Sequence, residues 1–125
     1  MKVIKLVIIV LFGLMFLNAG LNKFFNYMPV PELTPEQLEA FGAFMKLSWL
    51  MPLVGAAEVV GGILVIPPKT RALGAIILLP VMVGVLAHHA TMDPSGIYIP
   101  LAMFIILLWV ILDNWKKYQP MISEK

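Results

Sequence analysis

The chain has 125 residues, of which 61% are hydrophobic and 13% are charged, and its mean hydropathy is +0.94. Soluble domains carry about 25% charged residues, so this composition indicates a membrane protein, with room for a single domain over residues 1–125. The absence of cysteine excludes disulfides, thiolate metal sites and dithiol redox chemistry. The net charge of +2 does not indicate a nucleic-acid partner, because the basic residues lie beside apolar segments.

Apolar segments predict four membrane spans, at residues 3–25, 47–66, 72–90 and 97–112. About 20 apolar residues, each rising 1.5 Å, cross the roughly 30 Å hydrocarbon core of a bilayer. A cleaved signal peptide is the alternative for the first segment, but Leu17 is bulky where a cleavage site needs a small residue. We therefore expect an all-α integral membrane protein, built as a four-helix bundle.

A polar segment, residues 26–46, separates the first two spans. Thr34 suits a helix cap, Pro35 suits the first helical position, and Gln37 completes a capping box. Apolar residues then recur at helical spacing: Leu38, Phe41 and Met45. This pattern predicts a short amphipathic helix along the extracytoplasmic membrane surface, continuing into the second span, which Pro52 is expected to kink.

The distribution of basic residues predicts the orientation. With four spans, seven of the nine basic residues share one side of the membrane: Lys2, Lys5, Lys69, Arg71, Lys116, Lys117 and Lys125. The other side holds Lys23 and Lys46. The positive-inside rule therefore places both termini in the cytoplasm. The tail from Gln119 onward is expected to be mobile.

One carboxylic acid, Glu58, lies near the middle of the second span. An ionisable group at that depth costs about 2.5–3.5 kcal/mol on insertion scales, so such groups usually face a partner or a wet cavity. Small residues at helical spacing flank the acid, namely Gly55, Gly61 and Gly62, and they let another helix approach closely. Glu58 is therefore the centre of the candidate site.

The other intramembrane polar groups lie in the outer half of the predicted bundle. Turned inward, they form an outward-opening ligand pocket lined by Asn18, Asn22, Lys23, Glu58 and His88. The sequence identifies no catalytic residue. It predicts no metal site, because the chain offers too few nitrogen and sulfur ligands.

Each of these residues also has a structural alternative. Lys23 can extend its ammonium to the membrane interface, and Asn18 and Asn22 can join helices. Glu58, when its carboxyl group is protonated, can form a hydrogen bond between two helices. Of the two adjacent histidines, His89 is the one expected at the interface, because it points about 100° away from His88 on a helix.

Two patterns resemble the DoxX family of membrane proteins. The first span contains Gly13, Leu14, Phe16, Ala19, Gly20, Lys23 and Phe24 at the spacing of the family's opening pattern. Later residues that resemble the family are Glu58, Gly61, Gly62, Arg71, Ala72 and the late His88. The resemblance implies a four-helix protein of the bacterial inner membrane. The positions carried over from it are Lys23, Glu58, Arg71 and His88.

The resemblance also implies a function. It points to a small accessory subunit of a membrane redox system, with a quinone as the candidate ligand and a redox subunit as the partner, and without catalysis by this chain alone. Two alternatives stay open: a proton- or solute-handling carrier or channel, and an assembly factor with residues 30–46 as its partner surface. A homo-oligomer is also expected, because the fourth span otherwise meets mainly lipid.

Overall fold

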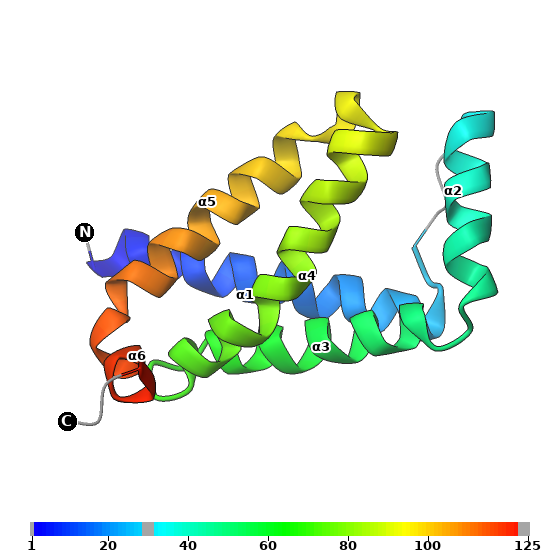
Figure 1. Ribbon diagram of the computed structural model, residues 1–125. Helices are drawn as coiled ribbons and strands as arrows, with labels where there is room; N and C mark the ends of the chain where they lie inside the picture. Colours follow the sequence, from blue (N-terminus) through cyan, green and yellow to red (C-terminus); the bar gives the residue numbers. More distant parts are fainter. Residues whose placement is uncertain (1, 29–31, 123–125) are drawn as a thin grey trace.

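The computed structural model describes residues 2–28 and 32–122, and every regular element within them is helical (Figure 1). The helices are α1 (Lys2–Phe25), α2 (Pro35–Lys46), α3 (Leu50–Val65), α4 (Arg71–Met92), α5 (Tyr98–Asp113) and α6 (Trp115–Ile122), with a 3₁₀ turn η1 (Pro94–Gly96) before α5. The predicted all-α membrane bundle is therefore confirmed, with α2 between the first two long apolar segments.

Two helices, α1 and α4, are each long and apolar enough to cross a membrane. Two further pairs pass the same test only when each pair is taken together: α2 with α3, bent by 88°, and α5 with α6, bent by 70°. The structure thus has two single-helix spans, and four spans if each bent pair counts as one. The bends explain why α3 and α5, at 16 residues each, are shorter than a full span.

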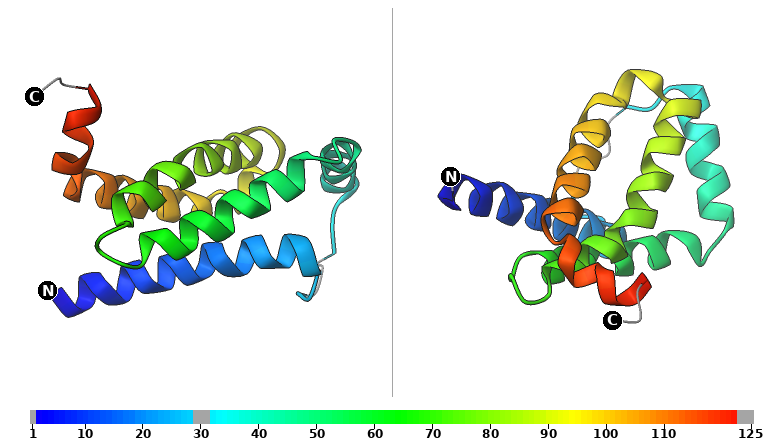
Figure 2. Two further views of the ribbon diagram at one scale, coloured as in Figure 1. Left: turned by 90° about the horizontal axis from the view of Figure 1, so that it is seen from below. Right: turned by 60° about the vertical axis from the view of Figure 1, so that its left-hand side comes forward.

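Helices α1 and α3 run side by side in opposite directions, as Figure 1 and the left view of Figure 2 show. Their backbones touch at two reciprocal glycine pairs, Gly13 with Gly62 and Gly20 with Gly55. A methyl group at Gly62 would lie 2.7 Å from the carbonyl oxygen of Gly13, and one at Gly20 would lie 2.6 Å from that of Gly55. The pairs are about two turns apart on each helix, so α1 and α3 stay close along this length.

Helices α4 and α5 cover this pair and complete one apolar core. Its buried members are Ile9, Phe12, Phe16, Val65, Ala75, Leu78, Met82, Leu107 and Val110. The start of α4 packs against α3, where Gly74 meets the carbonyl oxygen of Gly61. The other end of α4 diverges from α3 and approaches α2 (Figure 1). The bundle is therefore closed at one end and open beneath α2 at the other.

Helix α2 begins as the sequence predicts. The Thr34 hydroxyl accepts a hydrogen bond from the Gln37 backbone at 3.2 Å, and the Gln37 side chain accepts one from the Thr34 backbone at 2.9 Å. The chain then turns by 88° and leads from α2 into α3 through residues 47–49, so α2 lies across the axis of α3. The predicted kink at Pro52 is wrong. Since α3 begins at Leu50, Pro52 lies in its first turn, where a missing N–H breaks no helical hydrogen bond.

The C-terminal segment is helical instead of mobile as far as Ile122. The Tyr118 hydroxyl is buried and donates to the carbonyl oxygen of Ala72 at 2.6 Å, and the Lys117 ammonium donates to that of Pro68 at 2.8 Å. These two bonds fasten α6 to the turn between α3 and α4, a contact that the polar composition of the tail did not predict.

The glycine contacts give the first testable prediction. We expect Gly62→Ala to lower the free energy of unfolding by about 1–3 kcal/mol, because its methyl group meets rigid backbone on α1. Gly84→Ala is the matched control, since its added methyl group would meet no atom within 4 Å beyond the local backbone of its own helix, and it should raise stability by about 0.5–1 kcal/mol. Denaturant titration in detergent measures both changes, and equal effects would contradict the close α1–α3 contact.

Candidate functional site

A buried ion pair joins α1 to α3. Glu58 is 4% exposed and faces α1 between the two glycine pairs. Lys23, near the end of α1, places its Nζ 2.5 Å from Oε1 of Glu58. Gly55 provides the room, because even a methyl group there would lie only 3.2 Å from Cβ of Lys23. Lys23 therefore turns its ammonium inward to the acid.

The ammonium is the main compensation for the buried carboxylate. Oε1 of Glu58 is buried, and its charged partner among residues 2–28 and 32–122 is the Lys23 ammonium, 2.5 Å away. Removing one partner of a buried pair leaves an uncompensated charge, which costs far more than losing an exposed pair. Lys23 and Glu58 therefore depend on each other for burial.

A partly open cavity of about 550 Å³ lies beside this pair, bordered by three segments. Residues from the end of α1 and the turn after it are Asn22, Lys23, Asn26 and Met28. Those on or just before α2 are Leu33, Phe41 and Met45, and those at the start of α3 are Leu47, Ser48, Met51 and Pro52. Lys23 lines the cavity and Glu58 does not, so Lys23 connects the cavity with the buried acid.

The polar lining of the cavity is richest in hydrogen-bond donors. The side-chain oxygen of Asn22 accepts from the Met28 backbone at 2.9 Å, which leaves its NH₂ group to donate. Lys23 offers only donors, and Ser48 adds a hydroxyl. Asn26 has a left-handed backbone (φ 52°), and it ends α1 by donating to the carbonyl oxygen of Asn22 at 2.7 Å. The cavity thus suits a ligand that carries acceptor oxygens.

Asn18 lies outside the cavity lining and supports the turn after α1. The Tyr27 hydroxyl donates to the Asn18 backbone oxygen at 3.0 Å and also to its side-chain oxygen, while the Asn18 NH₂ group contacts the Met28 sulfur at 3.3 Å. Together with Asn22, it holds residues 26–28 against the end of α1. Both asparagines therefore fold the chain locally, and Asn22 alone of the two also lines the cavity.

His88 lies at a second, smaller cavity of about 130 Å³, which Gln37, Phe44 and Asp93 also line. Its ring packs edge-on against Phe44 of α2, with ring centres 5.3 Å apart. Its Nδ1 is buried, and no residue of the described ranges hydrogen-bonds to it. The neighbouring His89 is held by a 2.8 Å bond between its Nδ1 and the carbonyl oxygen of Val85.

The predicted residues thus do not line a single pocket. Leu33 and Phe41 line both cavities and stand between them, because α2 crosses the open end of the bundle. The structure brings Lys23 to Glu58 and places Lys23 and Asn22 at the larger cavity. It leaves Asn18 and His88 outside that cavity. That any of these residues binds a ligand stays a prediction.

Arg71 has a structural position. It is buried, and its Nε and Nη2 donate to the carbonyl oxygens of Val65 and Ile66 at 3.0 and 2.7 Å. A cation at these free carbonyls stabilises the end of a helix. Arg71 therefore holds the tight turn between α3 and α4.

Sequence reasoning missed Ser48 and all three methionines that line the larger cavity. The helical spacing placed Met45 on the apolar face of α2 and not in a pocket, and Met28 and Met51 sit in segments without any periodic signal. They reach the cavity because the turn after α1 and the start of α3 both fold toward α2.

These features define a multi-pass α-helical membrane protein with an ion pair buried beside a cavity. Residues 1–93 match the family described as "Methylamine utilisation protein MauE", and the chain belongs to this family. The matched region contains α1 to α4, and therefore both cavities and the ion pair. The family is DoxX-like in kind, so the resemblance in the sequence holds at that coarser level.

The chain is also similar to a curated bacterial protein. It is 30% identical over 91 residues to "Uncharacterized protein YwoB" of Bacillus subtilis (strain 168), across 63% of this chain. The match spans 58% of the length of that relative. No solved structure matches the chain.

The ion pair gives the second prediction. Lys23→Met should cost about 3–5 kcal/mol of stability, because it leaves the Glu58 carboxylate buried and uncompensated. Glu58→Gln should cost less, since the Lys23 side chain is 24% exposed and can turn toward the cavity. The double variant should recover part of the loss from Lys23→Met. Unfolding titrations of the three variants form a double-mutant cycle.

The control for this cycle is the exposed pair between Lys5 and Asp113, whose side chains are 36% and 38% exposed. Lys5→Met should cost no more than about 1 kcal/mol. A loss no larger than this from Lys23→Met would contradict the conclusion that Lys23 and Glu58 depend on each other for burial.

Proposed function

We propose that this protein is a small DoxX-like accessory subunit of a quinone-linked membrane redox system, and that the quinone ring binds in the 550 Å³ cavity beside Lys23 and Glu58. The observation that carries the proposal is the donor-rich lining of that cavity next to a buried ion pair. A partner subunit would carry out the chemistry, and this chain would hold the ligand.

The chemistry of the lining favours a quinone over other small molecules. A quinone ring is flat and apolar and has carbonyl acceptors, which match the NH₂ group of Asn22, the ammonium of Lys23 and the hydroxyl of Ser48. The flexible thioethers of Met28 and Met51 can adapt to such a ring. A small cation would instead meet the positive charge of Lys23. The cavity therefore fits a neutral acceptor ligand best.

The role proposed for the ion pair follows from its geometry. Glu58 occupies one side of the Lys23 ammonium, and the remaining N–H groups can donate to a carbonyl in the cavity. A donor held in place in this way stabilises the negative charge that develops on a quinone oxygen during reduction. Lys23 would thus bind the ligand and Glu58 would position Lys23.

The family description is compatible with this role. It names methylamine utilisation, and oxidation of an amine releases electrons that need an acceptor. An accessory membrane protein with a quinone site would connect such a system to the membrane. We propose that the present chain makes this connection. We also propose that residues 1–125 form a single domain.

We also propose that the protein lies in the bacterial inner membrane with both termini in the cytoplasm. The support is the arrangement of charge: the described ends of the chain and the basic turn at residues 66–70 share one end of the bundle, and α2 crosses the other end (Figure 1). In this orientation both cavities lie toward the outer side.

An assembly factor is the second candidate, favoured by one observation about α2. This helix buries only Ala40, and it leaves Leu38, Phe41 and Met45 exposed. A partner protein could cover these side chains. Part of the proposed partner surface, residues 30–31, lies outside the described residues. The carrier alternative has less support, since Glu58 is buried and lines neither cavity.

The third prediction tests the ligand. A short-chain quinone should quench the fluorescence of Trp49, which follows Ser48 at the cavity, in a variant carrying Trp109→Phe and Trp115→Phe. Ser48→Ala should weaken binding about 2- to 10-fold through the loss of one hydrogen bond, and Ser95→Ala should not change it. Quenching that does not saturate, or equal affinities in both serine variants, would contradict the proposed site.

The fourth prediction tests the orientation and uses the natural absence of cysteine. In intact cells, a membrane-impermeant maleimide should label Glu36→Cys on α2 and should not label Lys69→Cys. Both positions are exposed in the structure and lie at opposite ends of the bundle. Permeabilised cells provide the control, in which both variants should react. Labelling of Lys69→Cys alone in intact cells would reverse the proposed orientation.

A further inference from the structure

We propose that the basic end of the bundle binds anionic phospholipid, with α6 lying on the membrane surface and Lys69 and Lys116 contacting the phosphates of lipid headgroups. The proposal concerns the end opposite α2, so it does not depend on the function of the cavities.

The position of α6 is the first support. The chain bends by 70° between α5 and α6, so α6 crosses the end of the bundle instead of extending α5 (Figure 1). The buried Tyr118 hydroxyl and the Lys117 ammonium fasten it to the turn between α3 and α4. A helix that lies across the axis of a membrane span is placed at the level of the headgroups.

The charges at this end are the second support. The bond from Lys117 to Pro68 brings the neighbouring Lys116 and Lys69 to one area, and both of these lysines are exposed. Asp113, the one acid on α5 and α6, is already paired with Lys5, and no acid among the described residues pairs with Lys69 or Lys116. The positive charge of these two lysines is therefore available to an external anion.

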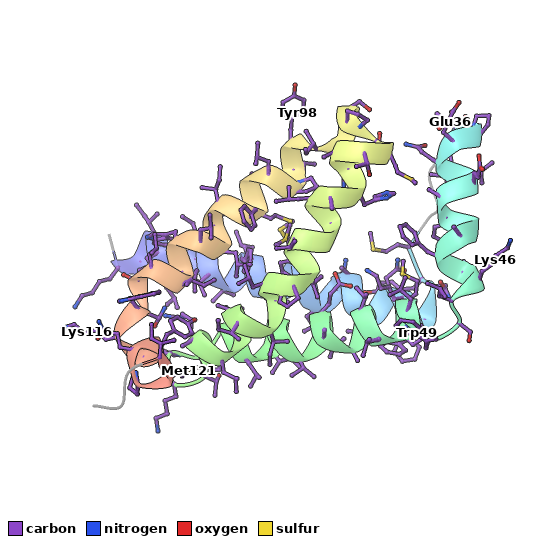
Figure 3. The ribbon with its side chains drawn as sticks, in the orientation of Figure 1. Glu36, Lys46, Trp49, Tyr98, Lys116 and Met121 are labelled. Carbon is purple, nitrogen blue, oxygen red and sulfur yellow. The ribbon has the colours of Figure 1, made fainter. Side chains whose placement is uncertain are left out.

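The apolar side chains of α6 show which anion fits. Trp115, Met121 and Ile122 are 45%, 72% and 76% exposed, on the same short helix as the lysines. Figure 3 places Met121 and Lys116 together at this end, away from Lys46 and Trp49. Apolar side chains beside lysines suit the boundary between acyl chains and headgroups. There a single ligand offers an acyl chain to the apolar side chains and a charged headgroup to the lysines. A phospholipid meets this requirement, and a soluble anion does not.

The test uses the full-length protein in nanodiscs that contain phosphatidylcholine and phosphatidylglycerol. Native mass spectrometry should show that the protein retains phosphatidylglycerol in preference, with 0.5 M salt weakening the preference. In the variant Lys69→Gln/Lys116→Gln, the preference for phosphatidylglycerol should fall about fivefold for each lysine removed, since each lysine contributes about a factor of five near an anionic surface. Lys117 is left unchanged because it fastens α6 to the bundle.

Lys46→Gln is the matched control, an exposed lysine at the opposite end of the bundle, and it should keep the full preference. A wild-type protein without preference for phosphatidylglycerol would overturn the proposal. So would an equal loss in Lys46→Gln, or complete displacement of the lipid by inorganic phosphate. Thermal unfolding of each variant confirms that it is folded, and the single variant Lys116→Gln repeats the test with the least change to the chain.

Discussion

The rest of the structure depends on one constraint, the need to compensate a carboxylate that is buried within a membrane bundle. Glu58 is almost fully buried, and the only cation of the described residues that reaches it is the ammonium of Lys23. That contact requires α1 and α3 to approach until their backbones touch, which the pairs Gly20–Gly55 and Gly13–Gly62 allow. The ion pair therefore depends on the glycines, because bulkier residues at the glycine positions would move α1 and α3 apart and separate the two charges.

The same constraint explains why the cavity lies where it does. Helices α1 and α3 are fixed against each other along their glycine contacts, so the larger cavity lies beyond these contacts, between the end of α1, α2 and the start of α3 at the open end of the bundle. Helix α2 crosses that end and divides the space, with Leu33 and Phe41 between the two cavities. The rigid pair holds Lys23 in place, while α2, which buries only Ala40, is held by few contacts.

The sequence was sufficient for features that local rules decide. Apolar length predicted the long helices, the capping residues predicted the start of α2, and a lone acid in an apolar segment identified Glu58. It was insufficient where the outcome depends on a bend or a long side chain. Lys23 can point outward or inward at equal helical spacing, and Pro52 kinks a helix only if the helix begins well before it. The 88° bend after α2 then separates His88 from Lys23.

The pairing of the charges also bears on the kind of ligand that we propose for the cavity. The positive charge of Lys23 faces the cavity but is already balanced by Glu58, so a neutral molecule can enter without burying net charge. An anion would have to compete with Glu58 for the ammonium, and a cation would meet its repulsion. A neutral ligand needs neither exchange, and in the proposed site the donors of Asn22 and Ser48 would hold it by its acceptor oxygens. A quinone is neutral and also soluble in the bilayer, so it would reach the cavity from the membrane itself, which is why we propose a quinone and not a polar solute.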